Sequence, residues 1–305
     1  MIETSKIVWT KCIELQPDEL PMVVYDNDKK EIAQALANVA KAISGRCELV
    51  LMPKTTRNGE EPPEDIKMKM QEADAVVAST TFSLTHTDAV QSALKRSTRI
   101  ITMPGITKDI FLRAIPIDYD KLRHRNILLA KKLQGKEFHI ETKAGTDLII
   151  FRGNREVMTN TGILAYSVRK LENLPAGEVF FAPLEKKSEG RIVIDGSSVG
   201  GAVKRPFKII VENGEMVDCE NKNLWKILTS IENGVNLAEL GIGTNPKAQI
   251  TGVILEDEKV QGTAHIAFGT NKSMGGLIQT SVHIDSIFKK PIISVDGKIV
   301  LHGTF

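Results

Sequence analysis

The sequence predicts an α/β plus α+β protein: a three-layer α/β domain with a parallel sheet, followed by an α+β domain with a largely antiparallel sheet. Two observations predict this. Short apolar runs alternate with amphipathic helical patterns up to about residue 115, whereas strands joined by tight turns dominate the second half. A length of 305 residues is also comfortable for two domains. We place the domains at residues 1–125 and 126–305.

The first domain is indicated by four β-rich runs, at residues 22 to 25, 47 to 53, 74 to 80 and 98 to 104. Amphipathic segments lie between them; in one, Ile32, Leu36, Val39 and Ile43 form a single helical stripe. Strands and helices that recur about every 25 residues are typical of parallel strands with crossover helices. The polar, proline-containing stretch 54 to 65 is predicted to be a loop.

The second domain follows a predicted linking helix at about residues 118 to 134. Tight turns join its strands, as at Ala144-Gly145 and Asp296-Gly297. An Asp-Gly pair between β-rich runs predicts a hairpin, because a type I′ turn needs positive φ at both central residues. Residues 221 to 234 are expected to form one helix. The whole pattern predicts antiparallel pairing.

The composition limits the classes of binding partner that we expect. The net charge of +2 arises from 40 basic and 38 acidic residues spread along the chain, so we expect neither a nucleic-acid partner nor a membrane partner. The three cysteines are widely spaced, which favours reduced thiols. The first residues lack the organisation of a signal peptide, and no apolar run is long enough for a membrane span. We expect a cytoplasmic protein.

Two of the six histidines lie among other potential metal ligands. His283 and Asp285 are two residues apart in a predicted strand, so both side chains should point to the same face. An imidazole and a carboxylate suit zinc, iron, manganese or cobalt. A solvated strand face is the alternative. The other histidines, each interpreted as a surface or hydrogen-bonded residue, are His86, His124, His139 and His302.

His265 follows a run of three acids. Glu256 and Asp257 are expected in a solvated turn, while Glu258 stays a candidate for the site. Two further acids, Glu178 and Glu239, stand among apolar and glycine residues. A buried carboxylate without a partner costs several kcal/mol, and a cation would remove that cost. The alternative for these two glutamates is a position at the edge of a strand.

Glycine-rich segments occur at residues 196 to 201, 240 to 245 and 273 to 276. None of them has the spacing of a phosphate-binding loop or of a dinucleotide fingerprint, and no serine nucleophile elbow is present. These segments are expected to make turns or to allow close backbone approach around a pocket.

Four segments, NLPAGEVF, AELGIGTN, EDEKVQGTAHIAFG and SVHID, occur in the order found in metallo-aminopeptidases of the aminopeptidase T and aminopeptidase S type, which this chain resembles from about residue 130 onward. The resemblance implies a site for one or two divalent ions, zinc, cobalt or manganese, in the second domain. The implied ligands are Glu178, Glu239, His265, His283 and Asp285. The family's tyrosine is missing, and Lys272 stands seven residues after His265.

The resemblance implies an aminopeptidase that removes N-terminal residues from peptides. Glu178 or Glu258 would act as general base, and Lys272 and Asn245 would contact the substrate. A homodimer is expected, as in the resembling peptidases.

Two alternatives stay open. The similar 2,5-dihydroxypyridine dioxygenases use one iron(II), for which His265, His283 and Asp285 would form a facial triad. The chain could also be a non-catalytic relative that binds a metal or a small ligand.

Overall fold

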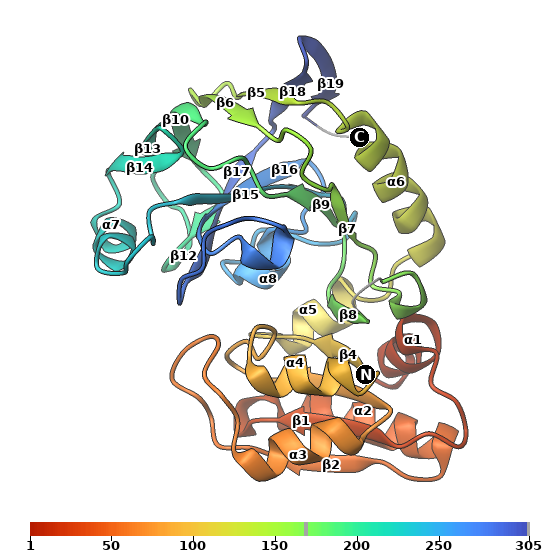
Figure 1. Ribbon diagram of the computed structural model, residues 1–305. Helices are drawn as coiled ribbons and strands as arrows, with labels where there is room; N and C mark the ends of the chain where they lie inside the picture. Colours follow the sequence, from red (N-terminus) through yellow and green to blue (C-terminus); the bar gives the residue numbers. More distant parts are fainter. Residues whose placement is uncertain (168–169, 304–305) are drawn as a thin grey trace. The chain divides into compact units, whose positions relative to one another are not determined.

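The computed structural model describes residues 1–167 and 170–303, which divide into two compact units (Figure 1). Unit 1 comprises Met1–Tyr119 and Asn160–Ala176, and unit 2 comprises Asp120–Thr159 and the chain from Gly177 onward. Residues 160 to 176, which the sequence boundary assigned to the second domain, therefore pack within unit 1.

Unit 1 is built on one parallel sheet, sheet A, in the order β2-β1-β3-β4-β8. The strands are β1 (Pro21–Tyr25), β2 (Glu48–Leu51), β3 (Ala75–Ser79), β4 (Arg99–Thr102) and β8 (Leu171–Asn173). The first four match the β-rich runs of the sequence. The fifth, only three residues long, was not predicted, and it reaches the sheet from beyond the linking helix.

Helices cover both faces of sheet A, as expected for alternating parallel strands and crossover helices. They are α1 (Ile2–Ile7), η1 (Val8–Ile13), η2 (Asn27–Lys29), α2 (Lys30–Ser44), α3 (Glu64–Glu72), α4 (Asp88–Lys95), α5 (Lys108–Arg113) and η3 (Leu164–Tyr166). α1 packs beside α2, and α3 packs beside α4. Right-handed crossovers from β1 to β2 and back to β3 place α2 and α3 on opposite faces. The predicted three-layer α/β architecture is confirmed.

Unit 2 contains two antiparallel sheets. Sheet B has the order β14-β13-β10-β6-β5-β18-β19, and sheet C has the order β12-β11-β17-β16-β15-β9-β7. In sheet B the strands are β5 (Glu137–Glu141), β6 (Asp147–Phe151), β10 (Glu189–Ile194), β13 (Phe207–Glu212), β14 (Glu215–Cys219), β18 (Ile292–Val295) and β19 (Lys298–His302). In sheet C they are β7 (Met158–Asn160), β9 (Glu178–Phe181), β11 (Ser197–Ser198), β12 (Gly201–Ala202), β15 (Leu237–Gly243), β16 (Thr263–Gly269) and β17 (His283–Lys289).

The helices of unit 2 are α6 (Tyr119–Lys132, in unit 2 from Asp120 on), α7 (Lys222–Thr229), α8 (Ile254–Asp257) and the short η4 (Lys272–Met274). α6 and α7 lie where the sequence predicted helices. Asp296 and Gly297 both have positive φ, as expected for the turn between β18 and β19. The α+β interpretation of the second half is therefore confirmed.

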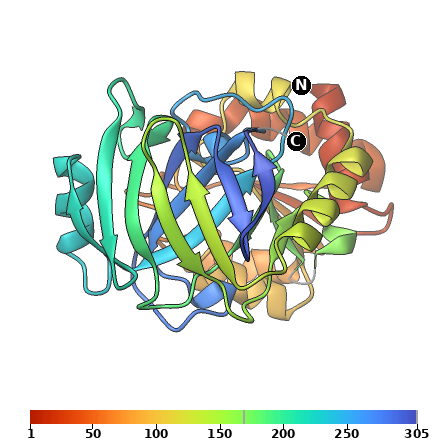
Figure 2. The ribbon, with the colours of Figure 1, turned by 90° about the horizontal axis from the view of Figure 1, so that it is seen from above.

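The two sheets of unit 2 share one hydrophobic core, and Figure 2 shows the strands of sheet B side by side with those of sheet C behind them. Alternate residues of β9, β15, β16 and β17 supply the side of sheet C that faces the core: Val179, Phe181, Leu240, Ile242, Ala264, Ile266, Phe268 and Phe288. Phe181 stacks at a tilt on Phe138 of β5, with ring centroids 4.6 Å apart. Period-2 alternation leaves the other face of sheet C free for polar residues.

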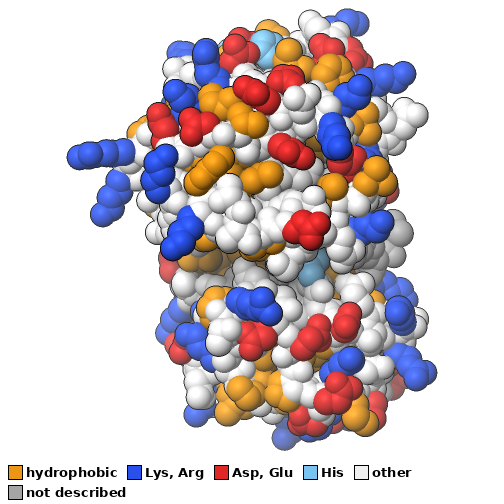
Figure 3. Space-filling view, turned by 60° about the vertical axis from the view of Figure 1, so that its left-hand side comes forward, with side chains coloured by type: hydrophobic (Ala, Val, Ile, Leu, Met, Phe, Trp, Pro, Cys, Tyr) orange, Lys and Arg blue, Asp and Glu red, His pale blue; other side chains and the backbone are white. Residues whose placement is uncertain are grey.

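On the face drawn in Figure 3, basic and acidic side chains are interspersed on each unit, in line with the nearly balanced composition. Of the helices in the described chain, none has the length and apolar character needed to cross a lipid bilayer.

We predict that Phe181→Ala lowers the free energy of unfolding by about 3 to 5 kcal/mol, because it empties a fully buried position between the two sheets. Phe180→Ala is the matched control, since this half-buried ring points to the opposite face. Urea unfolding followed by circular dichroism and tryptophan fluorescence measures both. Equal losses in the two variants would show that the core between the sheets does not depend on this ring.

Candidate metal centre

The face of sheet C that turns away from the core carries polar residues in register. Glu239, Ala267 and Asp285 lie directly opposite one another on β15, β16 and β17. In the neighbouring row, Gly241 lies opposite His265. Directly opposite residues of an antiparallel pair share a face, so two carboxylates and an imidazole gather on it.

The two remaining predicted ligands join the same face. Glu178, the first residue of β9, lies opposite Gly243, which shares the face of Glu239 four residues before it. His283 lies opposite Gly269 and is two residues from Asp285 on β17. Four strands thus bring together the five residues named from the sequence.

Small residues make room for these side chains. A Cβ on Gly241 would lie 2.1 Å from Nε2 of His265, and one on Gly243 would lie 2.2 Å from the carbonyl oxygen of Val260. Neither position tolerates a larger residue without displacement of the site. The glycines of the LGIGTN segment therefore have the expected role of allowing close approach, here of an imidazole ring and of a backbone segment.

Glu239 lies between the two histidine rings. Its Oε1 is 3.2 Å from Nε2 of His265, and its Oε2 is 3.1 Å from Nε2 of His283. Asp285 Oδ1 is 3.6 Å from the same nitrogen of His283, and Glu178 Oε2 is 3.5 Å from Nε2 of His265. Both imidazoles thus direct their Nε2 atoms into one carboxylate cluster.

The Nδ1 atoms of the two histidines differ in their hydrogen bonding. His283 Nδ1 lies 2.9 Å from the carbonyl oxygen of Thr270, an acceptor that keeps a proton on Nδ1 and leaves Nε2 for a ligand. His265 Nδ1 is buried and has no hydrogen-bond partner among the described residues.

The carboxylates hold protons on both rings when no cation is bound. Burial disfavours the charged form of His265, but the hydrogen bond and charge of Glu239, with Glu178 and Asp285, outweigh burial and raise its pKa to about 9. Burial likewise opposes charge on His283, while Asp285 and Glu239 raise its pKa well above the usual value. Burial of Glu239 works against its ionisation, yet the two histidines lower its pKa overall.

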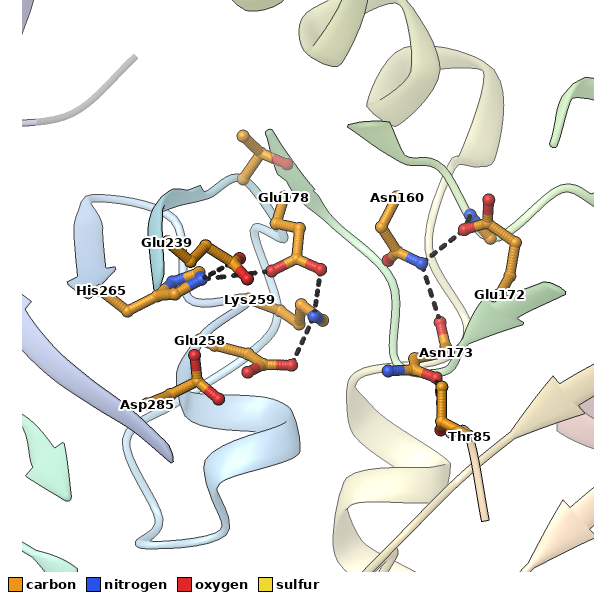
Figure 4. Close-up of polar contacts among 12 residues, drawn as sticks. Thr85, Asn160, Glu172, Asn173, Glu178, Glu239, Glu258, Lys259, His265 and Asp285 are labelled. Atoms are coloured by element: carbon orange, nitrogen blue, oxygen red, sulfur yellow. Dashed lines mark hydrogen bonds and ion pairs between the residues drawn. The ribbon is translucent and has the colours of Figure 1, made fainter. Parts of the chain in front are cut away.

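A buried lysine completes the cluster, and the sequence interpretation missed it. Lys259, whose side chain is 1% exposed, places Nζ 2.5 Å from Oε1 of Glu178 and 2.5 Å from Oε1 of Glu258 (Figure 4). Burial, only partly opposed by Lys259, raises the pKa of Glu258 to about 8, with Asp285 and Glu178 adding to the rise. In the sequence Lys259 ends an EDEK run, which resembles a solvated charged turn.

The cluster contains two groups of residues that could hold a metal ion. One comprises Glu178, Glu258 and His265, and the other comprises Glu239, His265 and Asp285; in each group the ligand atoms lie within 4.8 Å of one another. Imidazole nitrogens and carboxylate oxygens suit divalent transition metals, so the donor set fits such an ion.

Glu256 and Asp257 do not lie in a solvated turn as expected, because both are fully buried. Glu256 accepts a hydrogen bond from the backbone of Gln249, and Asp257 accepts from the backbones of Thr251 and Gly252. These carboxylates fix the loop before α8, and so position the segment that carries Glu258 and Lys259.

The two residues expected to contact substrate have other surroundings. Asn245 is fully buried, and its side-chain oxygen accepts hydrogen bonds from the backbones of Lys247 and Ala248. Its own backbone N–H donates to the carbonyl of Lys259. Lys272 is exposed in η4, and no contact between it and the ligand cluster is found in the described chain. A short loop turns its side chain to solvent, so its position seven residues after His265 does not bring it to the site.

We predict that Gly241→Ala weakens binding of a divalent ion by about 10- to 100-fold, because the new Cβ forces the His265 ring out of place. Isothermal titration with Mn²⁺ or Zn²⁺ measures the affinity. Gly297→Ala is the control, since that turn glycine has positive φ but no atom within 4 Å of an added Cβ. Unchanged affinity in the Gly241 variant would show that the ring position is not required.

Comparisons with known proteins favour a different chemistry from the one that the motifs suggested. Residues 15–305 match the family model described as NicX, 2,5-dihydroxypyridine 5,6-dioxygenase. The solved structure of 2,5-dihydroxypyridine dioxygenase from Pseudomonas putida KT2440 is similar, with a TM-score of 0.82 and 20% identity over 99% of this chain and 96% of that one. Among curated proteins no match was found.

The fold of wild-type AmpT from Thermus thermophilus is also similar, with a TM-score of 0.66 and 15% identity over 98% of each chain. The resemblance to aminopeptidases therefore holds for the fold. The expectation of a metallo-aminopeptidase, a peptide hydrolase, is wrong, because the family model that covers nearly the whole chain is that of a dioxygenase. This chain belongs to the 2,5-dihydroxypyridine 5,6-dioxygenase family.

Proposed function

We propose that this chain is an iron(II)-dependent dioxygenase that opens the ring of 2,5-dihydroxypyridine or of a closely similar dihydroxylated aromatic compound. The observation that carries the proposal is the convergence of His265, His283 and Asp285 around Glu239 on one face of sheet C. Membership of the dioxygenase family supports the choice of reaction.

The donor set is suited to iron(II). Two imidazoles and a carboxylate are the ligands of the facial triad of non-haem iron oxygenases, which leaves positions open for other ligands. His265, His283 and Asp285 would hold the ion. When bound, iron(II) would supply the one-electron steps through which O₂ reacts with an electron-rich ring.

Glu239 is placed to accept a proton from the substrate. In the metal-free protein its two oxygens contact Nε2 of His265 and of His283, the same atoms that would hold the ion. Once those nitrogens are ligands, they no longer donate to Glu239. Its carboxylate oxygens are then available to accept the proton of a ring hydroxyl, which makes the ring more electron-rich.

The overall reaction needs no added reductant. A ring-cleaving dioxygenase breaks one bond of the ring and places both atoms of O₂ in the product, so the ring itself supplies the electrons. Activity should therefore be independent of NADH or any other electron donor.

We predict that protein reconstituted anaerobically with iron(II) consumes about one O₂ per 2,5-dihydroxypyridine, with loss of the ring's ultraviolet absorption. Asp285→Ala should lower kcat/KM by about 100-fold or more, because it removes a proposed ligand. Asp218→Asn, at an exposed position of β14, is the matched control. An oxygen electrode and absorption spectra make the measurement.

The decisive negative result is folded, iron-loaded protein that takes up no oxygen with 2,5-dihydroxypyridine, hydroquinone or catechol. Release of an amino acid from peptides would not rescue the proposal, since it would identify a different reaction.

We also predict that metal binding at pH 7 releases about two protons per ion, because His265 and His283 carry protons in the metal-free protein and must lose them to coordinate. Calorimetry in buffers of different ionisation enthalpy counts the protons. Affinity should rise with pH, and the part of this rise that is due to His265 should end above its pKa of about 9. Binding at pH 7 with no proton release would contradict this.

The same pKa values set the sign of the stability change in the metal-free protein. Both imidazoles have folded-state pKa values above the ordinary 6.5, so their ion pairs stabilise the fold fully below that pH. The His265 contribution is lost as pH rises through about 9. His139→Gln, at a half-exposed position of β5, serves as the control in both experiments.

A further inference from the structure

We propose that Lys259 occupies the position of a second metal ion and so restricts this centre to one ion. The inference rests on the proposed function in one respect, that this face of sheet C binds a divalent ion. The role of Lys259 is to set the number of divalent ions that the site binds.

The ligand cluster has enough donors for two ions. The group of Glu178, Glu258 and His265 and the group of Glu239, His265 and Asp285 share one imidazole and so are adjacent. Neighbouring groups of acids and imidazoles of this kind are typical of two-metal sites, in which the ions lie about 3.5 to 4 Å apart. By donor count alone, the face would be expected to bind a pair.

Lys259 fills the first group. Its Nζ lies 2.5 Å from one oxygen of Glu178 and 2.5 Å from one oxygen of Glu258, and Figure 4 shows the ammonium between the two carboxylates. A divalent ion in that group would need the same oxygens at about 2.0 to 2.2 Å. An ammonium and a divalent ion cannot share them, because both are cations at contact distance.

The backbone holds this lysine in place. The N–H of Lys259 donates to the carbonyl of Glu256, and its carbonyl accepts from the N–H of Asn245. Gly243 permits this approach, since a Cβ there would lie 2.8 Å from the carbonyl carbon of Lys259. With a side chain only 1% exposed, the ammonium has no route to solvent without disrupting the segment.

The second group contains no lysine. Glu239, His265 and Asp285 meet His283 there, and no basic side chain other than these histidines contacts them within the described residues. One divalent ion therefore fits beside Lys259.

The test is metal stoichiometry, measured with Mn²⁺ on the intact protein and independent of oxygenase activity. We expect wild type to bind one Mn²⁺ per chain and to give the electron paramagnetic resonance signal of an isolated ion at excess Mn²⁺. Lys259→Gln should bind two ions with a spin-coupled signal. Lys259→Arg, which keeps the cation, should still bind one, as should the control Lys298→Gln at an exposed position of β19.

A coupled pair of ions in wild type would overturn the proposal, and so would a folded Lys259→Gln protein that binds only one. If that variant does not fold, the wild-type signal decides, since an isolated ion supports the proposal and a coupled pair refutes it. Wild type that binds no divalent ion would refute the proposed function as well. A single isolated ion without oxygen uptake would refute the function alone.

Discussion

The site depends on charge compensation within a buried face. Glu178 and Glu239 are each 7% exposed, and isolated carboxylates at such positions would be costly. In the metal-free protein one ammonium and two protonated imidazoles provide the balancing charge. Exchange of the two imidazole protons for the proposed divalent ion would leave the net charge of the cluster unchanged.

This compensation is possible because sheet C has two chemically distinct faces. One face of β15 contributes Leu240 and Ile242 to the core, whereas the other presents Glu239, Gly241 and Gly243. Side chains that alternate between core and site cannot shift by one residue without burying acids in the core, so the register is fixed by the hydrophobic pattern. The glycines then create the space into which His265 and the segment after α8 fit.

How far the sequence predicts this arrangement depends on the range of the interaction. Strands β1 to β4 and the shared face of His283 and Asp285 follow from local periodicity, which acts over a few residues. Strand β8 has only three residues, too few for a periodic signal, and Lys259 is identified only when Glu178, 81 residues away, is brought beside it. Its local charge pattern is the same as that of a solvated turn. Only the tertiary contact with Glu178 distinguishes a buried lysine from a solvated one.

The motifs led to the wrong reaction for a related reason. Four ordered segments specify which donors meet on the face, and imidazole with carboxylate suits zinc, manganese and iron(II) alike. The donor set is therefore suited to a divalent cation, but it does not distinguish hydrolysis from oxygenation. Groups that adjoin the donors add information that the donors themselves lack. A buried ammonium between Glu178 and Glu258 is such a group, and its effect is physical: it satisfies two carboxylates that would otherwise attract a second ion.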